Sequence, residues 1–291
     1  MLLAEKEGDE VLRNTFCHVP GIGTKSESGL WRKGYLSWDD VINEGLVESC
    51  GKNHYFLRQR IEESIDHLAG GNPTYFAKNL PSSLCWRLFQ DFRGATAYLD
   101  IETTGMAGTG SIITTISVYD GTSIFYYIQG DNLHKFIKDI TNYKVLVTYN
   151  GRCFDLPFIQ NYFGVKLNHA HIDLRFVLKS LGFTGGLKGC EKRIGLDRQD
   201  LDGIDGYAAV LLWNDFKANR NRNALETLLA YNILDAVNLE HLMVKAYNLK
   251  LKDTPFLETH TILTPTPVEN PFRPHEPTVS RIKRLRWDYS A

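Results

Sequence analysis

The stretch Ala97-Tyr98-Leu99-Asp100-Ile101-Glu102-Thr103-Thr104-Gly105 begins as an apolar run and then presents two carboxylates. Side chains alternate between the two faces of a β-strand, so Asp100 and Glu102 point to the same face. Leu99 and Ile101 point to the opposite face, into another layer. Acidic residues are poor strand formers, and two like charges this close repel each other unless a cation lies between them. The stretch therefore predicts a strand that holds a divalent cation, and the alternative is a solvated strand end before a turn.

The length and composition are typical of a folded protein with a large core. The chain has 291 residues, of which 43% are hydrophobic and 23% charged,. The formal net charge is -1, so nucleic-acid binding would depend on local basic patches. The five cysteines form no Cys-x-x-Cys pair, a pattern typical of reduced thiols in the cytoplasm. Because the sequence shows neither a signal peptide nor an apolar run of the ~20 residues that span a membrane, we expect a cytoplasmic protein without membrane contact.

Residues 1–93 show helical patterns and no strand pattern, which predicts an N-terminal helical module. Ser37 is followed three residues later by Asp40, the signature of a helix start, and the apolar spacing over residues 53–68 predicts a longer helix. Residues 20–23, Pro-Gly-Ile-Gly, resemble the turn of a helix-hairpin-helix motif, whose backbone amides point at a phosphate. An ordinary turn is the alternative, because glycine and proline also form these.

From residue 95 the pattern changes to strands and then to alternating helices and strands. Strands are expected over residues 96–101, 112–119, 123–128, 144–149 and 171–174,. A hairpin turn at Asp120-Gly121 makes the first three an antiparallel meander. Helices are expected over residues 133–140, 156–163, 173–181, 186–194, 206–216 and 225–247,. The order predicts an α/β domain with a mixed five-stranded sheet over residues 94–250.

Residues 251–291 contain six prolines. Proline interrupts regular structure, so we predict an extended tail or a wrapping arm. The tail ends in a basic segment with one aromatic residue, Arg281-Ile282-Lys283-Arg284-Leu285-Arg286-Trp287. This segment could bind phosphate, and the alternative is a solvated or docked terminus.

Two later motifs add carboxylates to the pair in the first strand. Asp155 follows the fourth strand in the run Asn150-Gly151-Arg152-Cys153-Phe154-Asp155 and opens a helix, where an aspartate is also a common structural cap,. In the last long helix, Tyr231 and Asp235 are four residues apart and share one face,. Asp235 lies beside the apolar stripe of that helix, where an unpaired carboxylate would be costly.

The elements Asp100-x-Glu102, Asn150-x-x-x-Phe154-Asp155 and Tyr231-x-x-x-Asp235 together resemble the three motifs of the DEDD exonuclease superfamily on the ribonuclease-H-like fold. Tyr231 places the resemblance in the DEDDy branch, since the DEDDh branch would have a histidine at the position of Ala230. The run Gly186-Leu187-Lys188-Gly189-Cys190-Glu191-Lys192-Arg193-Ile194-Gly195 is further similar to the bacterial YprB-type ribonuclease-H-like family. The likeness covers residues 95–247.

The resemblance implies a metal-dependent 3′→5′ exonuclease acting on the single-stranded 3′ end of DNA or RNA. Two Mg²⁺ or Mn²⁺ ions would be held by four carboxylates, Asp100, Glu102, Asp155 and Asp235. Tyr231 would aim the attacking water and not act as a base, since a free phenol has a pKa near ~10. The candidate substrate-binding residues are Asn150, Phe154, Thr103 and Lys188.

Several alternatives remain open at this point. A basic segment could follow a nucleic-acid backbone or form a solvated helix face; it comprises Lys188, Lys192, Arg193 and Arg198. Asp173 could support the carboxylates or cap a helix. The protein could also be a structure-specific endonuclease, or a catalytically inactive scaffold that binds nucleic acid. We expect a monomer that works with nucleic-acid-processing protein partners.

Overall fold

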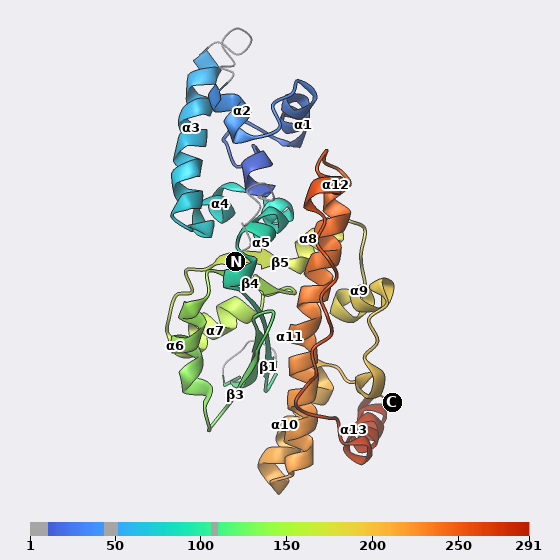
Figure 1. The fold of residues 1–291 in the computed structure, drawn as a ribbon. Coiled ribbons are helices and arrows are strands. Elements are labelled where there is room, and N and C mark those ends of the chain that lie inside the picture. Colours follow the sequence, from blue (N-terminus) through green and yellow to red (C-terminus); the bar gives the residue numbers. More distant parts are fainter. Residues whose placement is uncertain (1–10, 44–51, 106–109, 291) are drawn as a thin grey trace, which may run out of the picture.

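The computed structural model describes residues 11–43, 52–105 and 110–290. Its centre is a sheet of five strands in the order β3-β2-β1-β4-β5. The strands are β1 (Thr96–Thr103), β2 (Ile113–Tyr119), β3 (Ile124–Ile128), β4 (Val145–Thr148) and β5 (Ala170–Asp173). The first three form the expected antiparallel meander, while β4 pairs in parallel with β1 and with β5. The predicted fold class, a mixed five-stranded sheet flanked by helices, is confirmed (Figure 1).

Helices cover both faces of this sheet (Figure 1). One face packs against α6 (Phe136–Asp139), with the 3-10 turns η4 (Leu133–Lys135) and η5 (Ile140–Asn142) at its ends, and against α7 (Asp155–Phe163). The other face packs against α8 (Leu174–Ser180), α9 (Gly186–Ile194) and the long helix α11 (Arg222–Leu251). The 3-10 turn η6 (Gln199–Leu201) leads to α10 (Gly206–Asn219), which packs beside α11.

The residues of β1 alternate between the two cores, as expected. Leu99 and Ile101 belong to the core under α6 and α7. Tyr98 belongs to the core that β1 shares with α11. Asp100 and Glu102 follow Tyr98 at intervals of two, so both carboxylates point toward α11. The alternation of one strand thus supplies the hydrophobic core and the acidic pair at once.

The N-terminal module is helical, as predicted. Its elements are η1 (Val11–Asn14), α1 (Thr24–Arg32), α2 (Trp38–Asn43), α3 (Lys52–Ala69), α4 (Pro73–Asn79), η2 (Ser82–Arg87), α5 (Leu88–Asp91) and η3 (Arg93–Ala95). Asp40 Oδ2 accepts from the backbone N–H of Ser37 at 2.6 Å, and Ser37 Oγ accepts from the backbone N–H of Asp40 at 3.3 Å. This reciprocal pair confirms the predicted start of α2.

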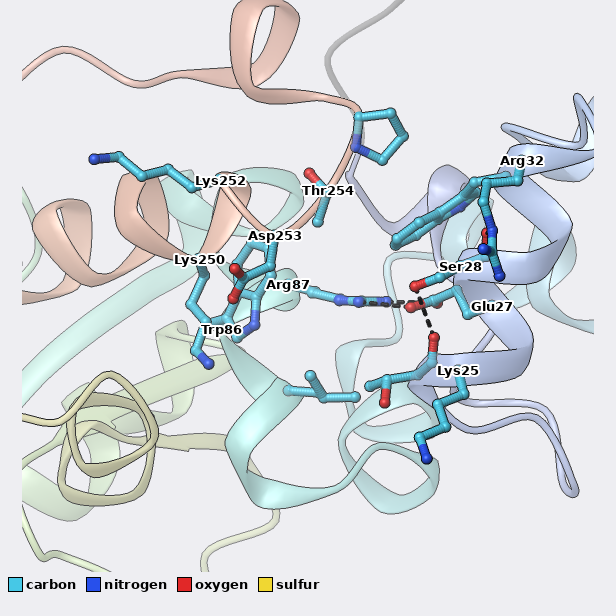
Figure 2. A pocket seen from close by; sticks show the side chains of 14 residues that line it. Lys25, Glu27, Ser28, Arg32, Trp86, Arg87, Lys250, Lys252, Asp253 and Thr254 are labelled. Atoms are coloured by element: carbon cyan, nitrogen blue, oxygen red, sulfur yellow. Dashed lines mark hydrogen bonds and ion pairs between the residues drawn. The ribbon is translucent and has the colours of Figure 1, made fainter.

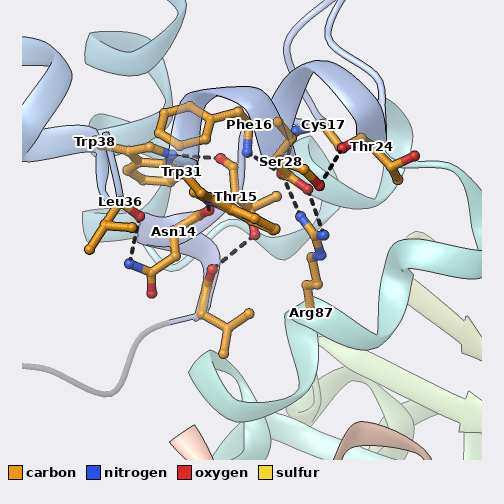
Figure 3. Close-up of polar contacts among 12 residues, drawn as sticks. Asn14, Thr15, Phe16, Cys17, Thr24, Ser28, Trp31, Leu36, Trp38 and Arg87 are labelled. Atoms are coloured by element: carbon orange, nitrogen blue, oxygen red, sulfur yellow. Dashed lines mark hydrogen bonds and ion pairs between the residues drawn. The ribbon is translucent and has the colours of Figure 1, made fainter. Parts of the chain in front are cut away.

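A buried ion pair holds the first turns of the module together. Glu27 on α1 accepts two hydrogen bonds from the Arg87 guanidinium, at 2.6 and 2.7 Å, and further bonds from the backbone N–H groups of Phe16 and Cys17. Both charged side chains are buried. Figure 3 shows Phe16, Cys17 and Arg87 converging on this point. Because both Glu27 oxygens are used internally, this carboxylate is not available to a ligand.

The module and the sheet share one hydrophobic core. Trp86 meets Tyr247 of α11 edge to face, with ring centroids 5.4 Å apart, and Trp31 meets Phe256 in the same way at 5.4 Å. Packing is therefore continuous across the predicted boundary between residues 93 and 94. The division into 1–93, 94–250 and 251–291 stays a prediction.

The C-terminal segment differs from the predicted extended tail. Residues 261–275 have no helix or strand, but α12 (Leu257–His260) precedes them and α13 (Glu276–Ser290) follows. The prediction is wrong for α13 because Pro277 lies in its first turn, where a missing N–H is tolerated. Val279 and Ile282 are buried against α10 and α11, and Arg281 is paired with Asp215. The Arg286 and Trp287 side chains of the basic segment lie outside the described residues.

Within the described part of the chain, each helix is too short or too polar to cross a bilayer.

Candidate active site

Three carboxylates from distant parts of the sequence converge between the sheet and α11. Oxygen atoms of Asp100, Glu102 and Asp235 all lie within 4.8 Å of one another. Glu102 and Asp235 are buried and Asp100 is half-buried. Asp155, at the start of α7, lines the same cavity of about 780 Å³. One of its oxygens accepts from the backbone N–H of Ile101 at 3.3 Å, so Asp155 is fixed against β1 and does not act as the helix cap.

Burial and mutual repulsion destabilise the charged form of the carboxyl groups in this cluster. Burial is the largest cause that raises the pKa of each of the four carboxyl groups, Asp100, Glu102, Asp155 and Asp235. For Asp155 the pKa rises to about 7. The charge of Asp235 further raises the pKa of Asp100 and of Glu102. Such a cluster fits a divalent cation, because hard oxygen donors are the ligands that Mg²⁺ and Mn²⁺ prefer.

The metal-free protein is expected to lose stability as pH rises from about 4 to about 7. The folded state holds the Asp155 proton up to a pKa of about 7, while the unfolded chain releases it near pH ~4. A raised pKa therefore stabilises the folded state at low pH, and this contribution disappears as pH rises through 7. Lys188 and Arg198 oppose the effect at Glu102 by lowering its pKa. The measurement is the melting temperature with EDTA at pH 5 and pH 7.5.

Saturating Mn²⁺ is expected to reverse this trend, so that the metal-induced rise in melting temperature is larger at pH 7.5 than at pH 5. Metal binding needs ionised carboxylates and competes with protons. A metal-induced shift of the same size at both pH values would contradict the assignment of the cluster as a cation site.

Asn232 holds Asp100 in place. Its amide nitrogen donates to Asp100 Oδ2 at 2.6 Å, and its amide oxygen accepts from the Ser117 hydroxyl at 2.8 Å. Asn232 is fully buried in the middle of α11. Its role could not be predicted from the sequence, because an asparagine inside a helix carries no spacing signal until its partner on β1 is known.

Arg198 supplies a buried positive charge beside Asp235. Its guanidinium donates to Asp235 Oδ1 at 2.5 Å and to both oxygens of Glu191, at 2.6 and 2.9 Å. Glu191 accepts a further bond from Asn238 at 2.8 Å. Burial alone would lower the pKa of Arg198, but Asp235 and Glu191 raise it overall, so the guanidinium stays charged. The prediction that Arg198 lies in an exposed basic segment is therefore wrong.

Tyr231 lines the cavity one helical turn before Asp235 and is almost fully buried. Two cations lie against its ring: the Lys188 ammonium is 5.1 Å from the ring centre and the Arg198 guanidinium 5.7 Å. Burial raises the pKa of Tyr231, and the charges of Asp235 and Glu102 raise it further. The side chain is therefore a neutral phenol at physiological pH, able to donate and accept hydrogen bonds.

Asp173 organises the loop that follows β4. Its carboxylate accepts from the backbone N–H groups of Asn150, Arg152 and Arg175, at 2.8, 3.1 and 3.0 Å. It caps α8 and also fixes the turn that carries Asn150, which has a φ of 67°. Gly151 follows in this turn, and a Cβ there would lie 2.1 Å from the Thr148 hydroxyl. The role of helix cap considered for Asp173 is thus confirmed, and its role as a support of the carboxylates stays a prediction.

The structure brings two of the four predicted substrate-binding residues to the cavity. Asn150 and Phe154 line it. Thr103 is buried, donates to the carbonyl of Gly105 and does not line the cavity. Lys188 does not line it either. Its ammonium donates to the carbonyl of Ile204 and lies against the Tyr231 ring. Arg175 and Lys179, which the sequence did not single out, are exposed cations on the cavity wall.

Comparison with known proteins gives one family match. A sequence model of the RNase_H superfamily matches residues 97–247, a range that contains all four carboxylates and Tyr231. No curated protein matches the sequence. Among solved structures, the chain is similar to the family B DNA polymerase from the hyperthermophilic archaeon Pyrobaculum calidifontis, with a TM-score of 0.35 and 14% sequence identity. The similarity covers 54% of this chain and 29% of the polymerase chain.

Proposed function

The chain belongs to the RNase_H superfamily, and we propose that it is a metal-dependent nuclease that removes nucleotides from the 3′ end of single-stranded DNA or RNA. The observation that carries the proposal is the convergence of Asp100, Glu102 and Asp235 beside Tyr231 in one cavity. Asp155 on the wall of the same cavity completes the predicted set of four carboxylates.

Asp100, Glu102, Asp155 and Asp235 would hold the cations. Bound there, two Mg²⁺ or Mn²⁺ ions would activate water and stabilise negative charge on the leaving 3′-oxygen. The protein keeps these ligands in place with Asn232, which fixes Asp100, and with Arg198, which fixes Asp235. Because one buried guanidinium offsets part of the negative charge, the ligands stay assembled before the cation arrives.

Tyr231 is proposed to orient the attacking water. Its raised pKa keeps the proton on the phenol, so the hydroxyl directs the water through hydrogen bonds and does not remove its proton. Lys188 and Arg198 both lie against the ring, which restricts where the hydroxyl can lie.

Replacing Tyr231 with phenylalanine is expected to lower the single-turnover rate by about 10²-fold, because an orienting group is lost while the ring packing is kept. Metal affinity should stay the same, and stability should change by no more than about 1 kcal/mol. Tyr55→Phe, at an exposed position on α3, is the matched control. Equal rates and equal metal affinities for Tyr231→Phe and the wild type would show that Tyr231 has no part in the mechanism. The proposed assignment of the chain to the DEDDy branch would then be wrong.

The cavity offers a place for a 3′-terminal nucleotide. Phe154 is half-buried and presents an aromatic surface on which a base could stack,. Asn150 offers amide groups, and its oxygen already accepts from Arg175 at 2.5 Å. Arg175 and Lys179 would contact the phosphates that follow. We therefore propose that these residues, and not Thr103 or Lys188, contact the substrate.

The product pattern tests the exonuclease mode. Linear and circular single strands of DNA and RNA, the linear ones labelled at the 5′ end, are incubated with Mn²⁺ or Mg²⁺. The proposal expects the linear strands to shorten one nucleotide at a time and the circles to stay intact. Cleavage of the circles would establish an endonuclease. Binding of linear strands without any cleavage at saturating metal would establish an inactive scaffold.

A further inference from the structure

A second large cavity, of about 960 Å³, lies between the N-terminal module and the end of α11. Its walls come from α1, from η2, from the C-terminal end of α11 and from the segment that follows it. Figure 2 shows Lys25 and Arg32 of α1 on one side and Lys250 and Lys252 on the other. We call this cavity, with these four cations, the basic cleft.

The basic cleft has an excess of positive charge. Arg87 is a fifth cation that lines the cleft, and the acidic residues that line it are Glu27 and Asp253. Glu27 is already paired with Arg87, which leaves Asp253 to balance four cations. Among the described residues, none of the four forms an ion pair. Such an arrangement in a chain of net charge -1 indicates a local site for an anionic ligand.

Aromatic surface lies among these charges. The half-buried Trp31 lines the cleft, and its ring is supported from the side by Phe256. Grooves that bind single-stranded nucleic acid combine cations that follow the backbone with aromatic rings on which bases stack. A small inorganic anion would not stack on the Trp31 ring, whereas a base would. This composition therefore favours a nucleic-acid strand.

The segment η2 links the basic cleft to the candidate active site. At its first residue, Ser82 accepts from Arg152 of the loop after β4, at 2.5 Å. At its other end, Trp86 and Arg87 line the basic cleft. The helix α8, which carries Arg175 and Lys179 of the active-site cavity, packs against η2. The helix α11, which carries Lys250 of the basic cleft, also contacts α8, so cations of the two cavities lie on neighbouring helices.

The separation of the two cavities suits a short length of strand. Asp235 and Lys250 are 15 residues apart on α11, which corresponds to about 22 Å at 1.5 Å per residue. This distance is about 7 nucleotides at the ~3.4 Å rise of one duplex strand, and fewer if the strand is extended.

We infer that the basic cleft binds phosphates in the upstream part of the same single strand whose 3′ end enters the active site. The inference rests on the proposed function, because it takes the substrate from it. It predicts that affinity depends on strand length, since only a strand that spans both cavities contacts the lysines of the cleft.

The test measures binding directly, in EDTA, by fluorescence anisotropy of labelled single strands of about 4 and about 20 nucleotides. The full-length wild type is compared with the double variant Lys25→Gln/Lys252→Gln, in which both side chains are exposed. The matched control is Lys33→Gln/Lys245→Gln, which removes two exposed lysines near the end of α1 and on α11 but outside the cleft.

We expect the wild type and the control to bind the longer strand more tightly than the shorter one. The cleft variant should bind the longer strand about 10-fold more weakly than the wild type. The slope of log K against log salt should become shallower by about 1.4, as for two lost phosphate contacts. Equal affinity of the cleft variant and the wild type for the longer strand would overturn the inference, and so would equal weakening in the control.

Failure of the inference is distinguishable from failure of the proposed function. A protein that cleaves 3′ ends but shows no effect of the cleft variant overturns the inference alone. A protein that binds the longer strand through the cleft but never cleaves it overturns the proposed function and supports the cleft as a nucleic-acid site. A wild type that binds neither strand in EDTA and cleaves neither with Mn²⁺ overturns both.

Discussion

Replacing Asp100 with asparagine is expected to lower the rate of metal-dependent cleavage by at least about 10³-fold. Metal ions stabilise the transition state by several kcal/mol, and each 1.4 kcal/mol corresponds to a factor of about ten in rate. The asparagine removes one charged ligand from the three that converge. It keeps an oxygen that can accept the hydrogen bond from Asn232, so the fold should persist.

Stability measurements separate loss of the cation site from loss of the fold in Asp100→Asn. In EDTA at pH 7.5, this variant should melt at a higher temperature than the wild type, because one of several repelling carboxylates is gone. On addition of Mn²⁺ its melting temperature should rise by less than that of the wild type. Asp131→Asn, at an exposed position, is the control and should behave as the wild type. A variant with wild-type cleavage and a wild-type metal shift would falsify the role of Asp100.

Replacing Arg198 with methionine is expected to lower the free energy of unfolding by about 3–5 kcal/mol in EDTA at pH 7.5. Removal of one partner from a buried ion pair leaves an uncompensated buried charge, and here two carboxylates, Glu191 and Asp235, would lose their cation,. Mn²⁺ should restore part of this loss, because a cation can neutralise Asp235 but not Glu191. The measurement is urea unfolding with and without the metal.

Lys192→Met is the matched control for Arg198→Met, since it removes an exposed cation from the same segment. It should change the free energy of unfolding by less than about 0.5 kcal/mol. If Arg198→Met were as stable as this control, the guanidinium would not be needed to balance the two carboxylates. If Mn²⁺ restored none of the loss, Asp235 would not be a ligand of the cation.

The sheet could be predicted because its signals are local. Alternation in β1 placed Asp100 and Glu102 on one face, and the Asp120-Gly121 turn indicated the meander. The face shared by Tyr231 and Asp235 followed from helical spacing alone. In each case, one element determines the outcome, so the sequence of that element was enough.

The supporting residues of the site could not be predicted, because their partners are distant in the sequence. Arg198 is separated from Glu191 by the turn at Gly195 and from Asp235 by the whole of α10. Two other cations of its segment, Lys192 and Arg193, are exposed. Local composition therefore indicated a surface segment. The same limit applies to Asn232, which meets Asp100 across 132 positions.

Proline content misled the prediction for α13 in a different way. The number of prolines in residues 251–291 does not show where each one lies, and Pro277 lies in the first turn of a helix,.

The basic cleft could not be predicted from the sequence either, because its lysines come from distant parts of the chain, at Lys25 and at Lys250.

The most direct test of the proposed metal-dependent nuclease is the rate at which a 5′-labelled single strand shortens as Mn²⁺ is titrated into the EDTA-treated wild-type protein. The account predicts no shortening in EDTA, and a rate that rises with Mn²⁺ to a plateau as the strand loses one nucleotide at a time. A strand that shortens at the same rate in EDTA, or that stays intact at saturating Mn²⁺, would contradict it.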